Sequence, residues 1–433
     1  MGIAPARRAA FSILRAVGLG QGNSDSLLHS VEVDRLSPAD RNLCTALVMG
    51  TLRWQRVLDA ECRRFLSRPD VELPEDAWLA LRVGAYQLLF LDRIPVHAAI
   101  FEAVEWAKHS DAARQAGLIN AVLRKVASLP KDREFSAEAA YPEWMVARWR
   151  KFYGTEACRR ICAEGQREPQ TTLRLRTAQA EDALVTAGVV LGPGAFLSRA
   201  RVAESAISAD VAGAQVQDEG SQLVAELVGN GARILDCCAA PGGKTAVMLG
   251  NNPGAEMLAC DIHPARLAAM RQRLKWAGER VEYRLADAAQ LENAGRFDRI
   301  LCDVPCTGTG TLARNPEIRH RLQPGDLVRQ AERQRAILNC ALRLLAPGGR
   351  LLYATCSLEP EENERVVEAC LNSATGFHRV DLLGEFDRLV EQGIVHGDAV
   401  AEMRASGFRD GYLRTVPGLH PCDGFFAACI ERE

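Results

Sequence analysis

The chain has 433 residues, of which 48% are hydrophobic and 25% are charged, and both values are ordinary for globular proteins with substantial cores. At this length about two or three domains are expected. The formal net charge of −2 argues against binding a polyanion over the whole surface, so any contact with nucleic acid must come from a local basic patch. No run approaches the ~20 apolar residues of a membrane span, and residues 1–20 lack the apolar core of a signal peptide. The sequence therefore predicts a soluble, cytoplasmic protein, for which a monomer is the expected state.

Fourteen cysteines are spread over the chain, and no two of them form the C-x-x-C pair that structural zinc sites use. Scattered thiols are typical of proteins that stay in a reducing compartment. We expect reduced cysteines and no bound metal.

Residues 1–130 have helical patterning throughout. Ser37 and Pro38 supply an N-cap and a first-turn proline for one long helix. Further helices are predicted over residues 75–91, 97–108 and 112–127. The arginines of the long helix are interpreted as a solvated face, and an RNA-binding face is the alternative, because guanidinium groups grip phosphates through paired hydrogen bonds. These arginines are Arg41, Arg53, Arg56, Arg63 and Arg64. Residues 131–140 are polar and mixed, which favours a linker.

Residues 141–210 predict a small, basic α+β segment. Arg148, Arg150 and Lys151 lie among aromatic side chains, a pattern that suits RNA because rings stack on bases and cations hold the backbone. We take these three residues as candidate RNA contacts. The alternative, which we expect for most of the aromatic residues, is that they form the core of this segment. Residues 171–176 alternate apolar and polar side chains and predict a strand.

From residue 211 to residue 433, predicted strands alternate with helices, which is typical of a doubly wound parallel sheet and hence of a Rossmann-like α/β domain. The strands are predicted near residues 233–236, 256–261, 281–286, 297–302 and 350–354. A helix over residues 330–345 is expected to end before Pro347-Gly348-Gly349, and residues 424–430 predict a last strand.

The chain is organised around the stretch from Arg233 to Thr245, in which a strand, a glycine turn and a helix follow one another. This is the geometry in which a nucleotide-like ligand meets backbone N–H groups at a helix N-terminus. The stretch is neither G-x-G-x-x-G nor a Walker loop, because Gly-Lys-Thr lacks the upstream glycine. A cradle for phosphates is therefore not expected, and a cofactor without phosphates is favoured.

Aspartates follow three successive predicted strands, at Asp261, Asp287 and Asp303. Asp261 comes 19 residues after Gly242, close to the spacing of about 20 at which a carboxylate grips ribose hydroxyls. Asp287 is placed to accept from an adenine amino group. A single aspartate after a strand is usually a turn former, but three at successive strand ends favour recognition of adenosine. Adenosine without a phosphate cradle indicates S-adenosylmethionine, whose sulfonium also suits a site lined with carboxylates.

Two thiols are predicted at the same sheet edge, Cys306 after the fourth strand and Cys356 after the fifth. Carbon 5 of a pyrimidine takes a methyl group only after a thiolate adds to carbon 6. A carboxyl group that hydrogen-bonds ring nitrogen 3 drains the developing charge, a role that fits Asp303. Lys244 could help to keep a thiol ionised. Spacing alone does not decide which cysteine attacks. The other twelve cysteines are expected to be packing residues, because free cysteine is often buried.

Three motifs resemble the RNA cytosine-5 methyltransferases of the NOL/NOP2/Sun class. They are Cys-Ala-Ala-Pro-Gly-Gly-Lys at residues 238–244, Asp-x-Pro-Cys at 303–306, and Thr-Cys-Ser at 355–357 with Glu-Glu-Asn-Glu at 361–364. The helical first third is similar to a NusB-type RNA-binding domain, through residues 86–89, 95–99 and 118–124. That pairing is characteristic of the bacterial members that act on 16S rRNA. Departures are Cys237, where relatives carry a smaller residue, and Ala286, where glycine is common.

The resemblance implies residue roles and partners. It implies that Cys356 is the nucleophile, that Cys306 assists product release, and that the substrate is 16S rRNA, naked or in a partly assembled subunit. The cofactor residues that it implies are Cys238, Ala239, Ala240, Pro241, Gly242, Gly243, Lys244, Asp261, Asp287 and Asp303. A DNA cytosine-5 methyltransferase is the weaker alternative, because a Glu-Asn-Val-type element and a DNA-reading domain are missing from the sequence. A non-catalytic RNA-binding or ribosome-assembly factor that keeps a decayed fold is the second alternative.

Overall fold

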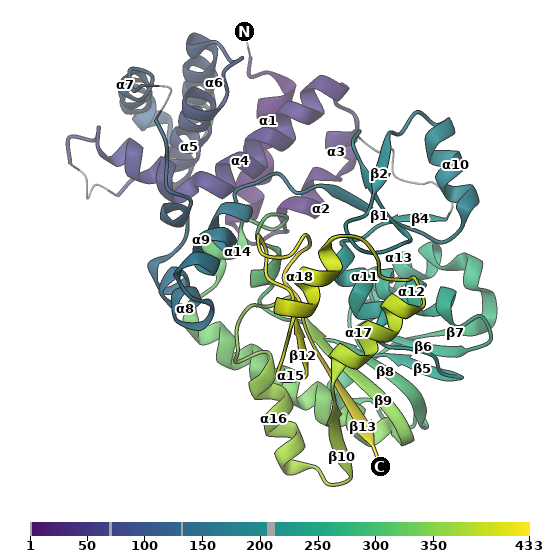
Figure 1. The fold of residues 1–433 in the computed structure, drawn as a ribbon. Coiled ribbons are helices and arrows are strands. Elements are labelled where there is room, and N and C mark those ends of the chain that lie inside the picture. The colour runs from purple at the N-terminus through teal and green to yellow at the C-terminus, as the bar shows by residue number, and fades with distance from the viewer. Residues whose placement is uncertain (1, 69–71, 131–132, 206–212) are drawn as a thin grey trace. The chain divides into compact units, whose positions relative to one another are not determined.

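A computed structural model describes residues 2–68, 72–130, 133–205 and 213–433 (Figure 1). Contacts between Cα atoms divide the chain into two compact units, one of Met1–Glu168 with Leu312–Arg321 and one of Pro169–Thr311 with Leu322–Glu433. These units group the chain differently from the three predicted domains and the linker at residues 131–140, whose boundaries stay predictions. The first two residues of the predicted linker, and the predicted boundary at residues 210 and 211, lie outside the described residues.

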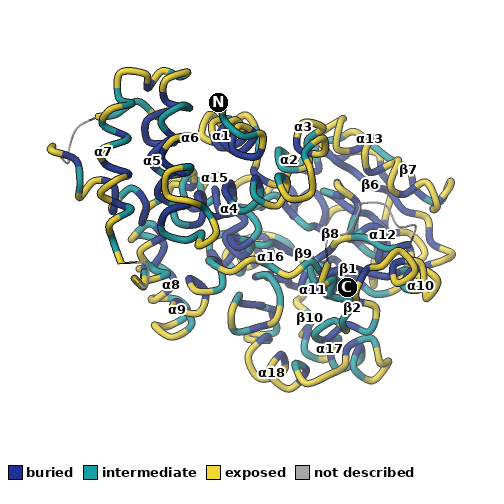
Figure 2. Tube along the Cα trace, turned by 90° about the horizontal axis from the view of Figure 1, so that it is seen from above, coloured by how far each residue is buried: buried dark blue, intermediate teal, exposed yellow. Residues whose placement is uncertain are grey.

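The first unit is helical. Its longest helix, α4, begins after Ser37, whose side chain accepts a hydrogen bond from the Asp40 N–H at 3.2 Å, with Pro38 in the first turn. The α-helices are α1 (Pro5–Gly18), α2 (Ser24–Leu28), α3 (Val31–Asp34), α4 (Pro38–Arg63), α5 (Glu75–Phe90), α6 (Val96–Lys108), α7 (Ala116–Val126), α8 (Glu143–Tyr153), α9 (Thr155–Glu164) and α14 (Ile318–Arg321), with short 3₁₀ turns η1 (Ala113–Gln115) and η2 (Ala137–Ala140). Buried and exposed residues alternate along α6 and α7, as expected of amphipathic helices (Figure 2).

Four of the five arginines of α4 and its end are exposed, as the solvated-face interpretation expects, but Arg53 is buried. The prediction was wrong at this position because the Arg53 guanidinium finds a carbonyl acceptor inside the unit. Its Nη2 donates to the Ala313 oxygen at 2.9 Å. A buried guanidinium with a carbonyl partner loses less on desolvation than an unpaired one.

Residues 312–321 are distant in the sequence from the other residues of this helical unit and are packed inside it. Arg319 is almost fully buried, lies 4.1 Å from the centre of the Tyr141 ring, and donates to the carbonyl oxygens of Gly165 at 3.0 Å and Leu312 at 3.1 Å. Both carboxylate oxygens of buried Glu317 accept hydrogen bonds from Ser24. These polar contacts hold the segment in the unit by specific partners.

The second unit contains a small antiparallel sheet in the order β2-β3-β1-β4, built from β1 (Thr171–Leu175), β2 (Leu191–Pro193), β3 (Ala200–Ala203) and β4 (Ala214–Val216). Helix α10 (Ala178–Thr186) packs on it through Ala180 and Leu184. Arg174 of β1 is buried and donates to Glu226 at 2.5 Å. The predicted strand is therefore present, with one of its arginines engaged in a buried ion pair.

The large sheet has the order β11-β12-β13-β9-β8-β5-β6-β7, with β10 paired to β13. Strands β7, β6, β5, β8 and β9 are parallel, and β13 is antiparallel to β9. The strands are β5 (Arg233–Asp236), β6 (Glu256–Asp261), β7 (Val281–Leu285), β8 (Phe297–Asp303), β9 (Leu345–Thr355), β10 (Phe377–Val380), β11 (Phe408–Arg409), β12 (Tyr412–Arg414) and β13 (Phe426–Arg432). The strand order reverses between β5 and β8, and a ligand of an open α/β sheet binds at such a switch point.

Helices cover both faces of this sheet (Figure 1). Strand side chains such as Ile234 and Leu301 pack with α11, α12, α13 and α17 on one face, and their neighbours Leu235 and Ile300 pack with α15 and α16 on the other. The helices are α11 (Glu219–Glu226), α12 (Gly243–Asn251), α13 (Pro264–Arg273), α15 (Pro324–Leu344), α16 (Glu364–Ser373), α17 (Leu382–Glu391) and α18 (Ala399–Ser406), with 3₁₀ turns η3 (Lys275–Arg280), η4 (Ala288–Gln290) and η5 (Thr309–Thr311). The predicted fold class, a doubly wound α/β domain after an all-α domain and a small α+β segment, is confirmed.

Two predicted boundaries were wrong by five residues or more. Helix α15 starts at Pro324 and not at residue 330, because Gln323 and Asp326 form a reciprocal capping box ahead of the apolar run. Strand β9 starts at Leu345, so Pro347-Gly348-Gly349 lies inside the strand and does not separate it from the helix.

Candidate active site

The two predicted catalytic thiols lie side by side. Cys306 follows β8 and Cys356 follows β9, and their Sγ atoms are 3.2 Å apart. Both side chains are half-buried. The hydrogen bond to Cys356, followed by burial and the negative charges of Cys356 and Glu362, raises the pKa of Cys306 well above its ordinary value. The geometry therefore places the two sulfurs in direct reach of each other.

Lys244 and Asp303 form an ion pair at the same edge of the sheet. The Lys244 Nζ donates to Asp303 Oδ2 at 2.7 Å and lies 5.1 Å from the centre of the Phe425 ring. Burial lowers the pKa of Lys244, but the charge and hydrogen bond of Asp303, with smaller contributions from Cys356 and Asp236, outweigh it and leave the pKa raised. Lys244 is thus held as a cation that faces both the carboxylate and the thiol.

The glycine turn after β5 leads directly into α12. Gly242 has φ of 97°, a left-handed conformation, and a Cβ there would meet the Met270 side chain at 2.8 Å. No side chain caps the first turn of α12. Backbone N–H groups at such a helix start are available to a ligand. Within the turn Ala239 and Ala240 are buried, whereas Cys238 and Gly243 are half-buried and Pro241 is exposed.

Asp261, the last residue of β6, and Asp287, which follows β7, take part in local backbone hydrogen bonds. Asp261 accepts from the Ala240 N–H at 3.2 Å and from the His263 N–H at 2.8 Å, so it links the second strand end to the glycine turn. Asp287 accepts from the Ala289 N–H at 3.0 Å. Each carboxylate therefore has the turn-forming role of an aspartate after a strand, and each stands at the carboxyl edge of the sheet.

Asp236, the last residue of β5, was not among the predicted site residues. It is completely buried, its Oδ2 accepts from the Thr245 hydroxyl at 2.7 Å, and its Oδ1 has no hydrogen-bond partner among the described residues. Burial raises its pKa to about 7. A buried carboxylate oxygen without a partner is expensive, and beside the glycine turn it is suited to a polar or cationic group of a ligand. The carboxylates of this edge thus fit a cofactor with a cationic centre and hydroxyl groups.

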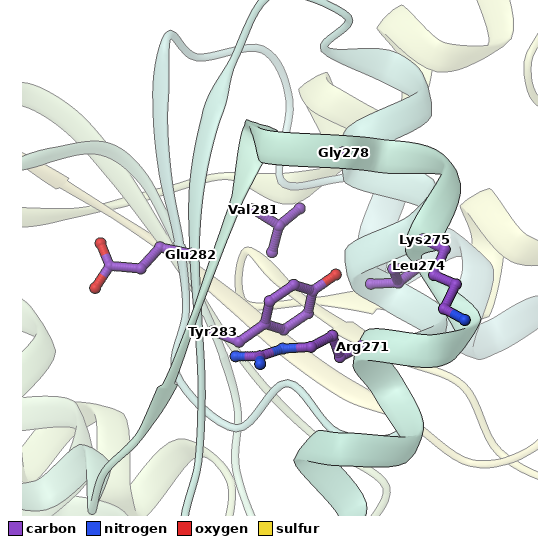
Figure 3. A pocket seen from close by; sticks show the side chains of 7 residues that line it. All are labelled: Arg271, Leu274, Lys275, Gly278, Val281, Glu282 and Tyr283. Atoms are coloured by element: carbon purple, nitrogen blue, oxygen red, sulfur yellow. The ribbon is translucent and has the colours of Figure 1, made fainter.

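A cavity of about 530 Å³ lies between α13, η3 and β7 (Figure 3). Arg271 lies along the ring of Tyr283, with its Cζ 5.2 Å from the ring centre, while Glu282 points to the other side of the strand. None of the predicted cofactor residues lines this cavity. It is therefore separate from the group of residues that the sequence predicted for the cofactor.

The three predicted RNA contacts lie on α8. Arg150 is exposed and pairs with Glu138. Arg148 and Lys151 both lie within 6 Å of the Phe152 ring, at 5.5 Å and 5.8 Å from its centre. Trp149 between them is fully buried, as expected of a core residue, whereas Trp144, Phe152 and Tyr153 are half-buried. The cations thus stand on the outer side of a packed helix.

Glu362 was also missed by the sequence reasoning, which took it only as part of a motif. It is completely buried and contacts residues next to both cysteines. Nothing in a polar run such as Glu-Glu-Asn-Glu distinguishes a buried carboxylate from a solvated helix start. The available indication was its position shortly after Cys356.

Comparisons with known proteins agree with this arrangement. Residues 226–431 match the family 16S rRNA methyltransferase RsmB/F, residues 4–128 match the NusB family, and residues 141–187 match the RsmF/B-like ferredoxin-like domain. A probable ribosomal RNA small subunit methyltransferase B of Bacillus subtilis is 31% identical, over 99% of this chain and 98% of its own length. The chain belongs to the small subunit rRNA methyltransferase B family. A further relative in Pseudomonas putida, a ribosomal RNA small subunit methyltransferase B, is 35% identical over 88% of this chain and 92% of its own length.

Solved structures support the fold of this methyltransferase B family member. The crystal structure of PH0851 has a TM-score of 0.79 and 23% identity, and the match covers 100% of both chains. NSun6 from Pyrococcus horikoshii, solved with SFG, has a TM-score of 0.55 and 20% identity over 67% of this chain and 98% of that one. The protein is an S-adenosylmethionine-dependent methyltransferase, as predicted. Among the described helices none is long and apolar enough to cross a membrane.

Proposed function

We propose that this methyltransferase transfers a methyl group to carbon 5 of a cytosine in 16S rRNA through a covalent bond between Cys356 and carbon 6 of the base. The observation that carries the proposal is the pair of thiols 3.2 Å apart, beside the Lys244–Asp303 ion pair. Methylation of an exocyclic amine needs no thiol, whereas methylation at carbon 5 needs a sulfur nucleophile. The names of the relatives support small-subunit rRNA as the substrate.

At the carboxyl edge of the sheet, one group of residues would bind the cofactor and another would bind the target base. When bound, S-adenosylmethionine supplies an electrophilic methyl group. The glycine turn from Cys238 to Lys244 and the carboxylates of Asp261 and Asp287 would hold it. Asp236, with its unpartnered oxygen, joins this set. The target base is turned out of the RNA to reach the thiols.

The first half of the reaction adds sulfur to the ring. The Cys356 sulfur gives an electron pair to carbon 6, and the ring electrons move so that carbon 5 becomes the nucleophile that takes the methyl group. Asp303 takes the role at ring nitrogen 3: in its protonated form the carboxyl group donates a hydrogen bond, and then its proton, to the nitrogen as charge develops there. Lys244, whose Nζ lies 2.7 Å from Asp303 Oδ2, stabilises the carboxylate that is left. Because the pKa of Lys244 is raised, its ammonium group stays positively charged near Asp303 and Cys356 during this half of the reaction.

The second half restores the aromatic ring. A base removes the proton from carbon 5, the carbon 5–carbon 6 double bond re-forms, and the electron pair of the carbon–sulfur bond leaves with the Cys356 sulfur. Cys306 lies within hydrogen-bond reach of that sulfur and, as a thiol, carries a proton that it can pass to the sulfur as it departs. We therefore propose that Cys306 assists product release.

The function is tested with purified protein, labelled cofactor and 16S rRNA from cells that lack the enzyme, naked and in partly assembled subunits. We expect label in the RNA, at a cytosine that bisulfite sequencing identifies as 5-methylcytosine. Label at another base or ring position would contradict the carbon-5 proposal. Retained RNA binding with no label under either condition would favour a non-catalytic assembly factor.

Arg148 and Arg150 are proposed to contact the RNA backbone. Reversal of both charges, Arg148→Glu with Arg150→Glu, is expected to weaken RNA binding and to lower the slope of log K against log salt by about 1.4, since each phosphate contact on single strands contributes about 0.7. Filter binding at several salt concentrations measures this slope. The control reverses Arg404 and Arg409, two exposed arginines that, like Arg150, have carboxylate partners. An unchanged slope in the Arg148 and Arg150 variant would return both residues to the solvated surface.

A further inference from the structure

Glu362 lies at the centre of a buried hydrogen-bond cluster next to the two thiols. Its carboxylate has no solvent exposure. Oε1 accepts from the Thr307 N–H at 2.9 Å and from the Gln334 side chain at 3.0 Å, and Oε2 accepts from the hydroxyls of Thr307 and Ser357. Four donors thus converge on one carboxylate, which satisfies a group that would otherwise be costly to bury.

The donors come from the two segments that carry the cysteines. Thr307 directly follows Cys306, and Ser357 directly follows Cys356. The Thr307 and Ser357 hydroxyls also lie 3.2 Å from each other. Gln334, from α15, donates a further hydrogen bond to the Pro305 oxygen at 2.9 Å, on the other side of Cys306. A single carboxylate therefore connects the turn after β8 to the turn after β9.

The position of Glu362 is fixed by its own backbone. Its carbonyl oxygen accepts from the buried Tyr353 hydroxyl at 2.6 Å. The next residue, Asn363, bonds the Thr355 hydroxyl at 2.6 Å and the Ser357 carbonyl at 2.8 Å, so it holds both sides of Cys356. These hydrogen bonds hold the backbone at Glu362 in place, so the position of its carboxylate does not depend on the side chain alone.

We propose that Glu362 is a positioning residue. It fixes the turn that carries Cys306 relative to the turn that carries Cys356, and so keeps the two sulfurs within reach of each other. The proposal deepens the carbon-5 function proposed above and rests on it for its catalytic consequence. Glu362 does not touch substrate in this role. It acts through Thr307 and Ser357, and a displacement of about 1 Å of a reacting group costs on the order of 10²-fold in rate.

The test replaces Glu362 by glutamine, which keeps the shape but turns one acceptor oxygen into a donor that faces other donors. We expect the Glu362→Gln variant to lose about 10²-fold in kcat for methyl transfer, with the KM for S-adenosylmethionine changed by less than about twofold, since the cofactor residues are untouched. Glu368→Gln, an exposed position on α16, removes the same charge without contact to either turn and should behave as wild type.

A second measurement reads the distance between the thiols without RNA or turnover. The azo oxidant diamide takes one hydrogen from each thiol, so that the sulfurs join as a disulfide and the azo bond becomes a hydrazine. Peptide mass mapping gives the rate at which Cys306 and Cys356 are joined. We expect rapid joining in the wild-type protein and in Glu368→Gln, and joining at least about tenfold slower in Glu362→Gln, because proximity sets this rate.

The two measurements separate the inference from the function on which it rests. An unchanged joining rate in a folded Glu362→Gln protein would overturn the positioning role, whatever the methylated atom proves to be. Slower joining with no carbon-5 methylation by the wild-type protein would leave the positioning role standing and reject the function. If Glu362→Gln does not fold, Thr307→Val and Ser357→Ala each remove one donor and must each slow the joining; normal rates in both would equally overturn the inference.

Discussion

The Cys356→Ala variant is expected to lose methyl transfer by at least about 10⁴-fold, since removal of a covalent nucleophile leaves only binding and electrostatic assistance. The variant should also form no covalent adduct with RNA that contains 5-fluorocytosine. Fluorine at carbon 5 cannot leave as a proton does, so the wild-type enzyme becomes trapped while still bonded to carbon 6. Gel analysis of denatured protein–RNA mixtures detects the trapped species, and filter assays with labelled cofactor measure the rate.

A matched control is Cys422→Ala, which removes another half-buried cysteine of the same unit. It should keep both turnover and capture. Normal turnover in Cys356→Ala would refute the assignment of the nucleophile.

In contrast to Cys356→Ala, the Cys306→Ala variant is expected to accumulate a covalent adduct with the RNA. The Cys356 sulfur can still attack, but the nearby proton donor at 3.2 Å is lost. Removal of a general acid slows its step by about 10²–10⁴-fold, so methylated RNA should remain bonded to the enzyme and turnover should fall by a similar factor. Incubation with unmodified RNA and labelled cofactor should give about one labelled adduct per enzyme, visible after denaturation.

This result would also decide between the two thiols. In the DNA cytosine-5 methyltransferases the thiol of the Pro-Cys motif attacks, which corresponds to Cys306. If Cys306→Ala formed no adduct and Cys356→Ala accumulated one, the two roles would have to be exchanged. A fully active, adduct-free Cys306→Ala protein would instead remove Cys306 from the reaction.

The proximity of Cys306 and Cys356 could be anticipated from the sequence because parallel strands place their carboxyl ends at a common edge. Each cysteine follows a predicted strand within a few residues, so a correct order of strands β8 and β9 is enough to bring them together. The Lys244–Asp303 pair follows in the same way from strands β5 and β8. Local sequence patterns are sufficient to predict these two contacts, because residues that follow parallel strands come together at the same edge of the sheet.

Glu362 and Arg319 could not be anticipated, for a common physical reason. Charged residues are almost never fully buried unless they are paired, and several of the partners here are distant in the sequence. Glu362 depends on Thr307, 55 residues away, and Arg319 depends on Gly165, 154 residues away. No periodicity records such partners. A polar run in a sequence predicts an exposed segment, and only the structure shows the hydrogen-bond partners that allow one of its residues to be buried.

The insertion of residues 312–321 into the helical unit limits how the protein can be dissected. A fragment that begins at Pro169 would keep Arg319 but lose Tyr141 and Gly165, which receive its guanidinium. That charge would be left without its aromatic and carbonyl partners, on a peptide that starts six residues after Cys306. The helical unit therefore cannot be deleted without consequence. We expect a shortened protein that keeps every catalytic side chain to misfold in the segment that follows Cys306.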